Sequence, residues 1–245
     1  IEQSNLFTNY WRAGFFSKVF LPAYNDEDIF RNEQAWAYKT ELWGYAGPSF
    51  STDRRKNLVI EADIGTGYGK NRGRGYRVSL GAEIKPIEPL NIEIKAMQDR
   101  GPIYMQWVDI IETADDTARV YANSLLLTRD VTLRLNWTFS PNLTFQCFVQ
   151  PFFADMKYES YYRLSAPETM ALEDYNNYLN DYDNPDFILK NTVGTFVLRW
   201  EYRSGSTIFI VYNLNDNKFY SPVDNAWTSE EANALYFKLN YWIKK

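Results

Sequence analysis

Histidine is absent from this 245-residue chain, and cysteine occurs only once, as Cys147. Histidine is the commonest general base in enzymes and the commonest metal ligand in proteins. Its absence excludes Ser-His-Asp triads, Cys-His dyads and HExxH zinc sites, and a single cysteine excludes an intrachain disulfide. We therefore expect no cofactor and no enzymatic activity.

Long hydrophobic runs are absent as well. No stretch approaches the roughly 18 consecutive apolar residues of a transmembrane helix, and the net charge of −5 argues against nucleic acid as a partner. Aromatic residues nevertheless make up 18% of the chain, while its mean hydropathy is −0.45. Apolar and polar residues must therefore be finely interleaved. Transmembrane β-strands have this pattern, because every second residue of about ten faces lipid.

Alternation is strictest over residues 131–140, VTLRLNWTFS. Successive side chains of a strand point to opposite faces of its sheet, so the segment predicts a strand with one apolar face. A tight turn at Pro141–Asn142 leads into a second alternating segment, and together they predict a hairpin. Residues 97–113 and 119–129 look like continuations of strands in which a β-bulge is expected. In all, about ten antiparallel up-and-down strands are predicted, over residues 6–20, 36–51, 58–66, 76–85, 90–113, 119–140, 143–151, 196–203, 207–213 and 235–243.

The predicted connections alternate in length along the chain. Those on one side are short, at Thr52–Asn57, Pro86–Pro89, Pro141–Asn142 and Ser204–Ser206. Those on the other side are longer, at Leu21–Ala35, Tyr68–Gly75, Ala114–Ala118, Tyr161–Asp186 and Leu214–Asn233. This asymmetry is typical of bacterial outer-membrane β-barrels, whose long loops are extracellular, and it predicts a periplasmic C-terminus. Because strand begins almost at Ile1, we expect residues 1–245 to be a single segment, the C-terminal part of a larger barrel.

The two faces of the predicted strands differ in character. Aromatic side chains near the short-turn ends are candidates for a membrane interface, where amphipathic rings lie at headgroup level: Trp137, Phe139, Trp200, Tyr202 and Tyr241. Polar side chains on the opposite face are candidates for the lumen: Arg134, Asn136, Arg199, Glu201, Arg203 and Lys238. Charges there either pair with one another or set the selectivity of a pore. A soluble β-sandwich also alternates, but the aromatic side chains at strand ends favour the membrane.

Four motifs carry a family resemblance: the run Phe50–Asn57, the run Leu133–Leu143 leading into Gln150–Ala154, the run Leu198–Ser206 and the closing run Lys238–Trp242. In this order they resemble the C-terminal barrel region of a family of Gram-negative outer-membrane proteins, a domain of unknown function. The resemblance implies an N-terminal domain similar to family-9 carbohydrate-binding modules, which is not visible in this chain. It also implies that the barrel continues beyond it.

Three loop motifs suggest chemistry, each with a plainer interpretation. The glycine-rich run 65–75 suggests a phosphate-binding loop, but no helix follows it, so a hairpin loop is favoured. Its Lys70, Arg72 and Arg74 could instead meet lipopolysaccharide phosphates. An acidic loop carries alternate oxygen ligands that suggest weak calcium binding, at Asp181, Asp183 and Asp186, although it lacks an EF-hand's glycine and glutamate. Tyrosines of the long loop suggest a glycan-stacking platform or a loop packed on itself: Tyr161, Tyr162, Tyr175, Tyr178 and Tyr182.

These patterns together predict an outer-membrane β-barrel that transports or binds glycans or related solutes through its lumen and long extracellular loops. A non-conducting accessory barrel of a larger complex is the alternative, and a hydrolase within the barrel comes third. The expected partners are the lipid bilayer and lipopolysaccharide, with glycans and other outer-membrane proteins as further candidates.

Overall fold

The protein is described by a computed structural model over residues 1–26, 36–112, 117–166, 171–175 and 178–243. One antiparallel sheet of 13 strands dominates it, in the order β1-β2-β5-β6-β7-β8-β9-β10-β12-β13-β14, with β11 and β15 paired to β10 and β13. Strands adjacent along the chain are adjacent in the sheet, so the predicted all-β, up-and-down topology is confirmed.

The strands lengthen toward the middle of the sheet. Their bounds are β1 Glu2–Leu6, β2 Arg12–Phe20, β5 Trp43–Ser51, β6 Leu58–Gly69, β7 Gly73–Ile87, β8 Leu90–Glu112, β9 Thr117–Ser140, β10 Leu143–Ala166, β11 Ala171–Asp174, β12 Phe187–Arg203, β13 Ser206–Ser221, β14 Ala226–Glu231 and β15 Ala234–Asn240. A second, small sheet pairs β3 Tyr24–Asn25 with β4 Tyr38–Lys39. The single helical turn within the described ranges is α1, Tyr178–Asp181. Among the residues described, no helix is long and apolar enough to cross a bilayer.

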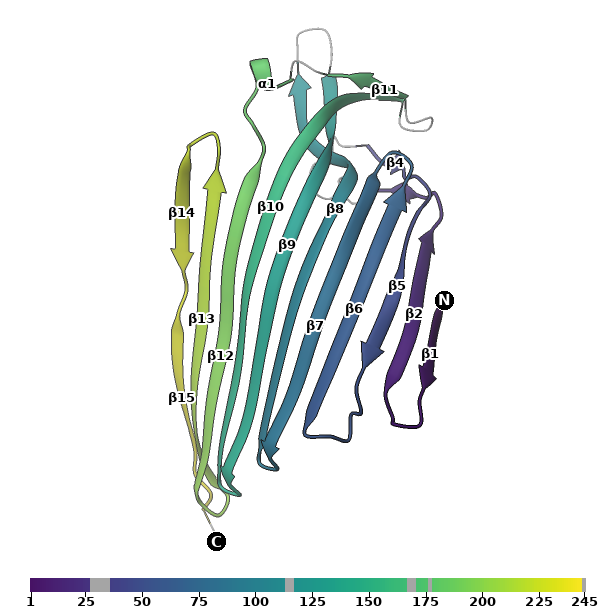
Figure 1. Ribbon diagram of the computed structural model, residues 1–245. Coiled ribbons are helices and arrows are strands. Elements are labelled where there is room, and N and C mark those ends of the chain that lie inside the picture. Colours follow the sequence, from purple (N-terminus) through teal and green to yellow (C-terminus); the bar gives the residue numbers. More distant parts are fainter. Residues whose placement is uncertain (27–35, 113–116, 167–170, 176–177, 244–245) are drawn as a thin grey trace.

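Short and long connections lie at opposite ends of the sheet (Figure 1). The lower end in that view, called here the short-turn end, has the turns at residues 7–11, 52–57, 88–89, 141–142 and 204–205. The upper end, called the long-loop end, holds β4, β11 and α1. The Ala114–Ala118 connection lies largely outside the described residues, as do parts of Leu21–Ala35 and Tyr161–Asp186.

Several predicted boundaries are wrong. The predicted strand at residues 36–51 is divided between β4, in the small sheet, and β5, and the connection predicted at Tyr161–Asp186 begins only after β10 ends at Ala166. Residues 6–20 do not form one strand, because a turn at residues 7–11 separates β1 from β2; Tyr10 has a φ of 64° there, and the Asn9 side chain accepts a hydrogen bond from the Trp11 amide. Residues 214–233 are not one long loop, because β13 continues to Ser221 and a short turn leads into β14. The predicted bulges in the long strands are present, as register shifts between Ile103 and Gln106 and between Trp107 and Asp109.

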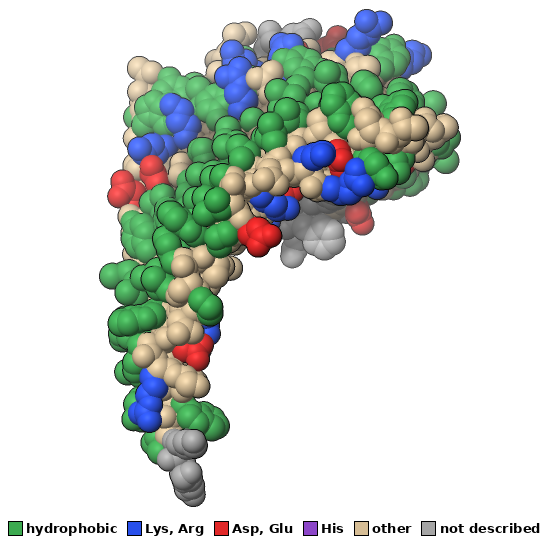
Figure 2. Space-filling model, turned by 60° about the horizontal axis from the view of Figure 1, so that its bottom comes forward, with side chains coloured by type: hydrophobic (Ala, Val, Ile, Leu, Met, Phe, Trp, Pro, Cys, Tyr) green, Lys and Arg blue, Asp and Glu red, His purple; other side chains and the backbone are tan. Residues whose placement is uncertain are grey.

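The alternation of each strand adds up to two continuous faces. Residues paired across neighbouring strands share a face. One row of such pairs crosses eight strands, and its members are apolar apart from one tyrosine. The row consists of Leu58, Ile84, Ile92, Leu135, Cys147, Phe196, Tyr212 and Leu235. We call the face that carries this row the outer face, and the opposite one the inner face. Seen from the short-turn end, the sheet bends into an arc whose outer margin is lined with hydrophobic side chains (Figure 2).

The sheet does not close into a ring. Among the described strands, β1 pairs only with β2, and β14 and β15 pair only with β13, so each edge of the arc has one free side. Most of the buried hydrophobic side chains gather at the long-loop end instead of between two layers. Two clusters lie there, one around Val120, Ala122 and Tyr161, the other around Met105 and Tyr121. Over most of its height the sheet is therefore a single layer.

Candidate functional site

Ion pairs occupy much of the inner face near the short-turn end. Arg199 lies 3.0 Å from Glu201, which also accepts a hydrogen bond from the Gly205 amide. Lys238 belongs to the same row as Arg199, on the far side of Phe209, and its Nζ lies 6.0 Å from that ring. The pair formed by Arg199 and Glu201 corresponds to one of the two roles predicted for these charges, which is pairing with one another.

Further from the edge, Arg134 stands in a row with Glu93 and Phe148. Its guanidinium carbon lies 5.4 Å from the centre of the Phe148 ring. Asn136 pairs with Asn91 and Gln146 in the next row. Five of the six predicted lumen residues therefore share the inner face.

Arg203 is the exception, and its predicted place on the inner face is wrong. The register of β12 and β13 shifts between Glu201 and Arg203, so that Arg203 pairs with Ser206. A bulge of this kind inserts a residue and turns the following side chain to the other face. Arg203 consequently donates a hydrogen bond of 3.2 Å to the Tyr241 hydroxyl.

The predicted interface aromatics lie on the outer face near the short-turn end. Trp137 and Phe139 on β9 have ring centres 4.2 Å apart, and Trp200 and Tyr202 on β12 have theirs 6.2 Å apart. All four are exposed. With Tyr241, they give this end of the outer face an aromatic border.

A group of aromatic side chains on the inner face was not predicted. Phe20 of β2 stacks on Trp43 of β5 with ring centres 4.0 Å apart and an interplanar angle of 3°. Tyr45 lies 6.1 Å from both Phe16 and Phe20. We call Phe16, Phe20, Trp43 and Tyr45 the inner aromatic cluster. The signal was available in the sequence, since these residues alternate within segments predicted as strands.

Glycines and charges frame the inner aromatic cluster. A Cβ on Gly65 would come within 3.3 Å of the Phe16 ring, so the tip of this ring lies close to the bare backbone of β6. Lys18 Nζ is 4.9 Å from the Phe20 ring centre, and the Arg72 guanidinium is 4.6 Å from that of Trp43. Glu41 accepts hydrogen bonds from the amides of Asn71 and Arg72 and so fixes the β6–β7 turn beside the cluster.

The loop tyrosines pack on one another. Tyr161 and Tyr178 are buried and stack with ring centres 4.6 Å apart, and Tyr182 stacks on the other side of Tyr178 at 5.2 Å. Burial raises the pKa of Tyr178 to about 12. Tyr175 lies at the edge of this cluster, and Tyr162 packs against a different one. The five do not form one open stacking platform, so this part of the prediction is corrected to the packed-loop alternative.

The remaining loop motifs do not converge on a ligand. Asp186 accepts a hydrogen bond of 2.7 Å from the Tyr158 amide, while Asp181 and Asp183 are exposed. Within the described ranges, no group of three acidic or cysteine side chains could hold a metal ion. The glycine-rich run 65–75 forms the β6–β7 hairpin, as favoured from the sequence, and its Arg72 points toward Trp43.

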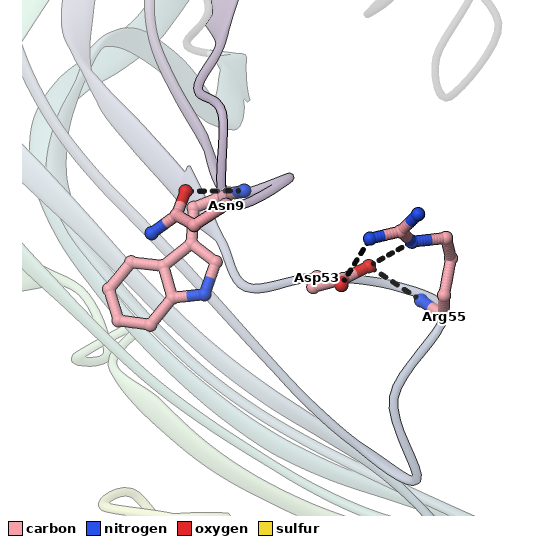
Figure 3. A network of polar contacts seen from close by, with 4 residues as sticks. Asn9, Asp53 and Arg55 are labelled. Carbon is pink, nitrogen blue, oxygen red and sulfur yellow. Dashed lines mark hydrogen bonds and ion pairs between the residues drawn. The ribbon is translucent and has the colours of Figure 1, made fainter.

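At the short-turn end, two neighbouring turns each have their own hydrogen bonds, at Asn9 and at Asp53 (Figure 3). The Asp53 carboxylate accepts hydrogen bonds from the backbone amide and the guanidinium of Arg55, and the Arg55 guanidinium lies 3.2 Å from the centre of the Tyr10 ring. Trp11 packs edge-on against Phe50 at 5.4 Å. The β1–β2 and β5–β6 connections therefore form one rigid corner.

Comparison with known proteins places the chain in a family. A family model, DUF5916, a domain of unknown function, matches residues 3–244. The chain belongs to this family. A search of curated protein sequences gave no match. The solved structure of a copper transporter, OprC, is similar at a TM-score of 0.59 and 9% identity, over 94% of this chain and 38% of that one. At that identity the likeness concerns the fold alone.

Proposed function

We propose that this member of DUF5916 forms one side of an outer-membrane β-barrel that binds or transports glycans or related solutes. In this proposal the long loops are extracellular and the C-terminus is periplasmic. The observation that carries it is the outer face, where large apolar side chains stay uncovered: Ile64 is 52% exposed, Leu80 55% and Phe237 66%. Contiguous exposed apolar surface of this kind marks an interaction with a membrane or a partner.

The height of the apolar surface fits a bilayer. On β9, outward apolar side chains run from Val131 to Phe139, which are eight residue steps apart. At about 3.4 Å per residue this is roughly 27 Å along the strand. A tilt of 35–45° reduces it to about 20 Å, close to the roughly 25 Å apolar band of outer-membrane barrels.

The two free edges support the idea that further strands complete the barrel. Hydrocarbon offers no hydrogen bonds, so an unpaired strand edge in the membrane leaves N–H and C=O groups unsatisfied at a cost of several kcal/mol each. Strands β1 and β15 must therefore pair with other strands when the sheet is in a bilayer. The chain spans 38% of the structurally similar transporter, which leaves room for such strands in one polypeptide.

The glycan part of the proposal is supported by the inner aromatic cluster. Aromatic rings beside glycine backbone, with charged groups near them, offer the apolar face and hydrogen-bonding rim that a sugar ring requires. Trp43 and Phe20 are half-buried and lie on the inner face near the long-loop end. A solute entering between the loops would meet them first.

Planar-bilayer recording on the full-length protein tests this function. We expect channel conductance that maltohexaose reduces, and we expect Trp43→Ala to abolish this block while leaving the conductance intact. Trp200→Ala, on the outer face, is the matched control and should leave the block unchanged. Absence of conductance together with absence of maltohexaose binding would refute transport and binding alike.

A non-conducting accessory barrel is the second candidate. It is favoured by one observation: the upper part of β10 bends over the long-loop end of the sheet with β11 beside it (Figure 1). A barrel covered in this way would conduct nothing while still partitioning into the membrane. Such a protein would insert into membranes and show heat-modifiable mobility on gels. In the same bilayer recordings it would give no current.

A further inference from the structure

Basic side chains gather on the part of the outer face that lies toward the long-loop end. On β9, β12 and β13, Arg129, Lys190 and Lys218 each lie six residues toward the long-loop end from a member of the apolar row described above. At about 3.4 Å per residue, six residues place them roughly 20 Å further along their strands. Arg74, Arg100 and Lys157 lie on the same face nearer still to the long loops. We call these six residues the basic band.

The row directly below Lys218 is acidic on β13 and β14, where Asp216 pairs with Glu231. Below that row the outer face carries no charge over several rows. From Ile94 through Leu133, Val149 and Leu214 toward the short-turn end, the paired positions are occupied by aliphatic, aromatic, glycine and cysteine residues. Charge thus begins abruptly on this face. In a bilayer such a boundary coincides with the headgroup region, where lysine and arginine meet lipid phosphates.

The band contains two like charges in direct opposition. Lys190 and Lys218 are a cross-strand pair of β12 and β13, and like charges in such pairs destabilise a sheet. Lys218 is partly neutralised by Asp216 at 3.4 Å, whereas Lys190 lies 4.4 Å over the Trp227 ring. Arg129 stands two strands from Lys190, with Phe153 between them. An anion held among these three side chains would remove the repulsion.

Aromatic and hollow surfaces border the band. Tyr220 and Trp227 lie in the next row on the outer face, with ring centres 5.4 Å apart. At the other end of the band, Arg74 lines a hollow of about 450 Å³ floored by Gly44 and Ala46. Cations beside apolar recesses suit an amphiphile with phosphate groups and acyl chains.

We infer that the basic band binds the phosphates of lipopolysaccharide in the outer leaflet, with Arg129, Lys190 and Lys218 as its centre. This inference rests on the proposed membrane function and adds a ligand to the outer face. Acidic side chains on that face, which include Asp155, Asp216 and Glu231, are fewer than the six cations. The site therefore keeps a net positive charge for the phosphates.

Binding of purified lipid A to the full-length protein in detergent tests the inference. The probes are bis-phosphorylated lipid A, dephosphorylated lipid A and inorganic phosphate. We expect the first to bind, and the triple variant R129Q/K190Q/K218Q to weaken it at least about tenfold, since each cation near such a surface contributes substantially. The matched control, R54Q/K56Q/K85Q, removes three cations from the short-turn end and should bind as the parent protein does.

The outcomes separate the two proposals. If the triple variant still inserts into membranes but binds lipid A as tightly as the parent, the lipid site is refuted and the barrel stands. Equal binding of dephosphorylated lipid A would refute phosphate recognition, and saturation by inorganic phosphate alone would refute a lipid ligand. Failure of the parent protein itself to enter membranes would refute the membrane function.

Discussion

Asp53 holds the corner between the first two short turns through one side chain. Its carboxylate accepts hydrogen bonds from the guanidinium and the amide of Arg55, and these interactions lower its pKa to about 2. A carboxylate with a depressed pKa stabilises the fold above its unfolded pKa, and the contribution disappears as the pH falls through the folded value. The stability that Asp53 contributes should therefore decline as the pH falls from 3.8 toward 2, and its contact with Arg55 should be lost as the pH passes through about 2.

Carboxyl NMR of the detergent-solubilised protein measures this effect. We expect the Asp53 resonance to titrate with a midpoint near 2. Arg55→Ala removes the hydrogen-bonding guanidinium and should raise the midpoint toward the ordinary 3.8. A midpoint already near 3.8 in the parent protein would contradict the Asp53–Arg55 interaction.

Glycine at position 47 allows two strands to approach closely. A Cβ there would lie 1.8 Å from the Ile64 carbonyl oxygen, a backbone atom that cannot move aside cheaply. Gly47→Ala should therefore lower the free energy of unfolding by about 1–3 kcal/mol, the usual cost of overpacking. Denaturant unfolding in detergent would report it. Gly81→Ala is the matched control, because its Cβ would meet no atom closer than 3.7 Å, and an equal loss in both variants would contradict the explanation.

At the scale of elements, the tyrosine cluster decides how the longest loop folds. Tyr178 of α1 lies between Tyr161 of β10 and Tyr182, so three stacked rings fasten the helical turn to the end of a strand. Tyr161 was predicted to begin the loop, whereas β10 continues to Ala166. The stacking depends on chain segments that meet only after folding. The loop is thereby given a defined shape despite its length.

Hydrogen exchange of α1 tests the role of this stack. Tyr178→Ala removes a side chain that is 3% exposed and should make local opening easier by about 3 kcal/mol, in the range for large-to-small changes at buried sites. The neighbouring Leu179 is 49% exposed, and Leu179→Ala should change exchange very little. Similar exchange in the two variants would mean that the ring stack does not hold the loop.

At the scale of the whole molecule, the two faces of the sheet set its environment. Leu135 belongs to the outer apolar row, whereas Asn136 points to the inner face. An arginine facing lipid near the bilayer centre costs about 2–4 kcal/mol, and one facing the lumen costs little. Leu135→Arg should thus reduce the heat-modifiable, membrane-inserted fraction, and Asn136→Arg should not. The reverse ranking would mean that the faces are assigned the wrong way round.

Much of this architecture could be predicted from local pattern. Residues 131–140 alternate so strictly that their strand and its outward residues follow from side-chain direction alone. The turn after them follows from Pro141–Asn142. The β13–β14 hairpin was missed because residues 215–218 are polar on both faces and give no period. Arg203 was misplaced because a bulge changes the parity of a strand without any signal in its own composition.

The sequence by itself determined the fold class, the antiparallel order and the separation of apolar from polar faces, because each depends on residues close together in the chain. Only the tertiary structure decided which residues from different strands share a row. That pairing brings Lys190 opposite Lys218, lays Trp43 on Phe20 and stacks Tyr161 on Tyr178. Register is set jointly by turns, bulges and the packing of a whole face, so it emerges only when the sheet is assembled.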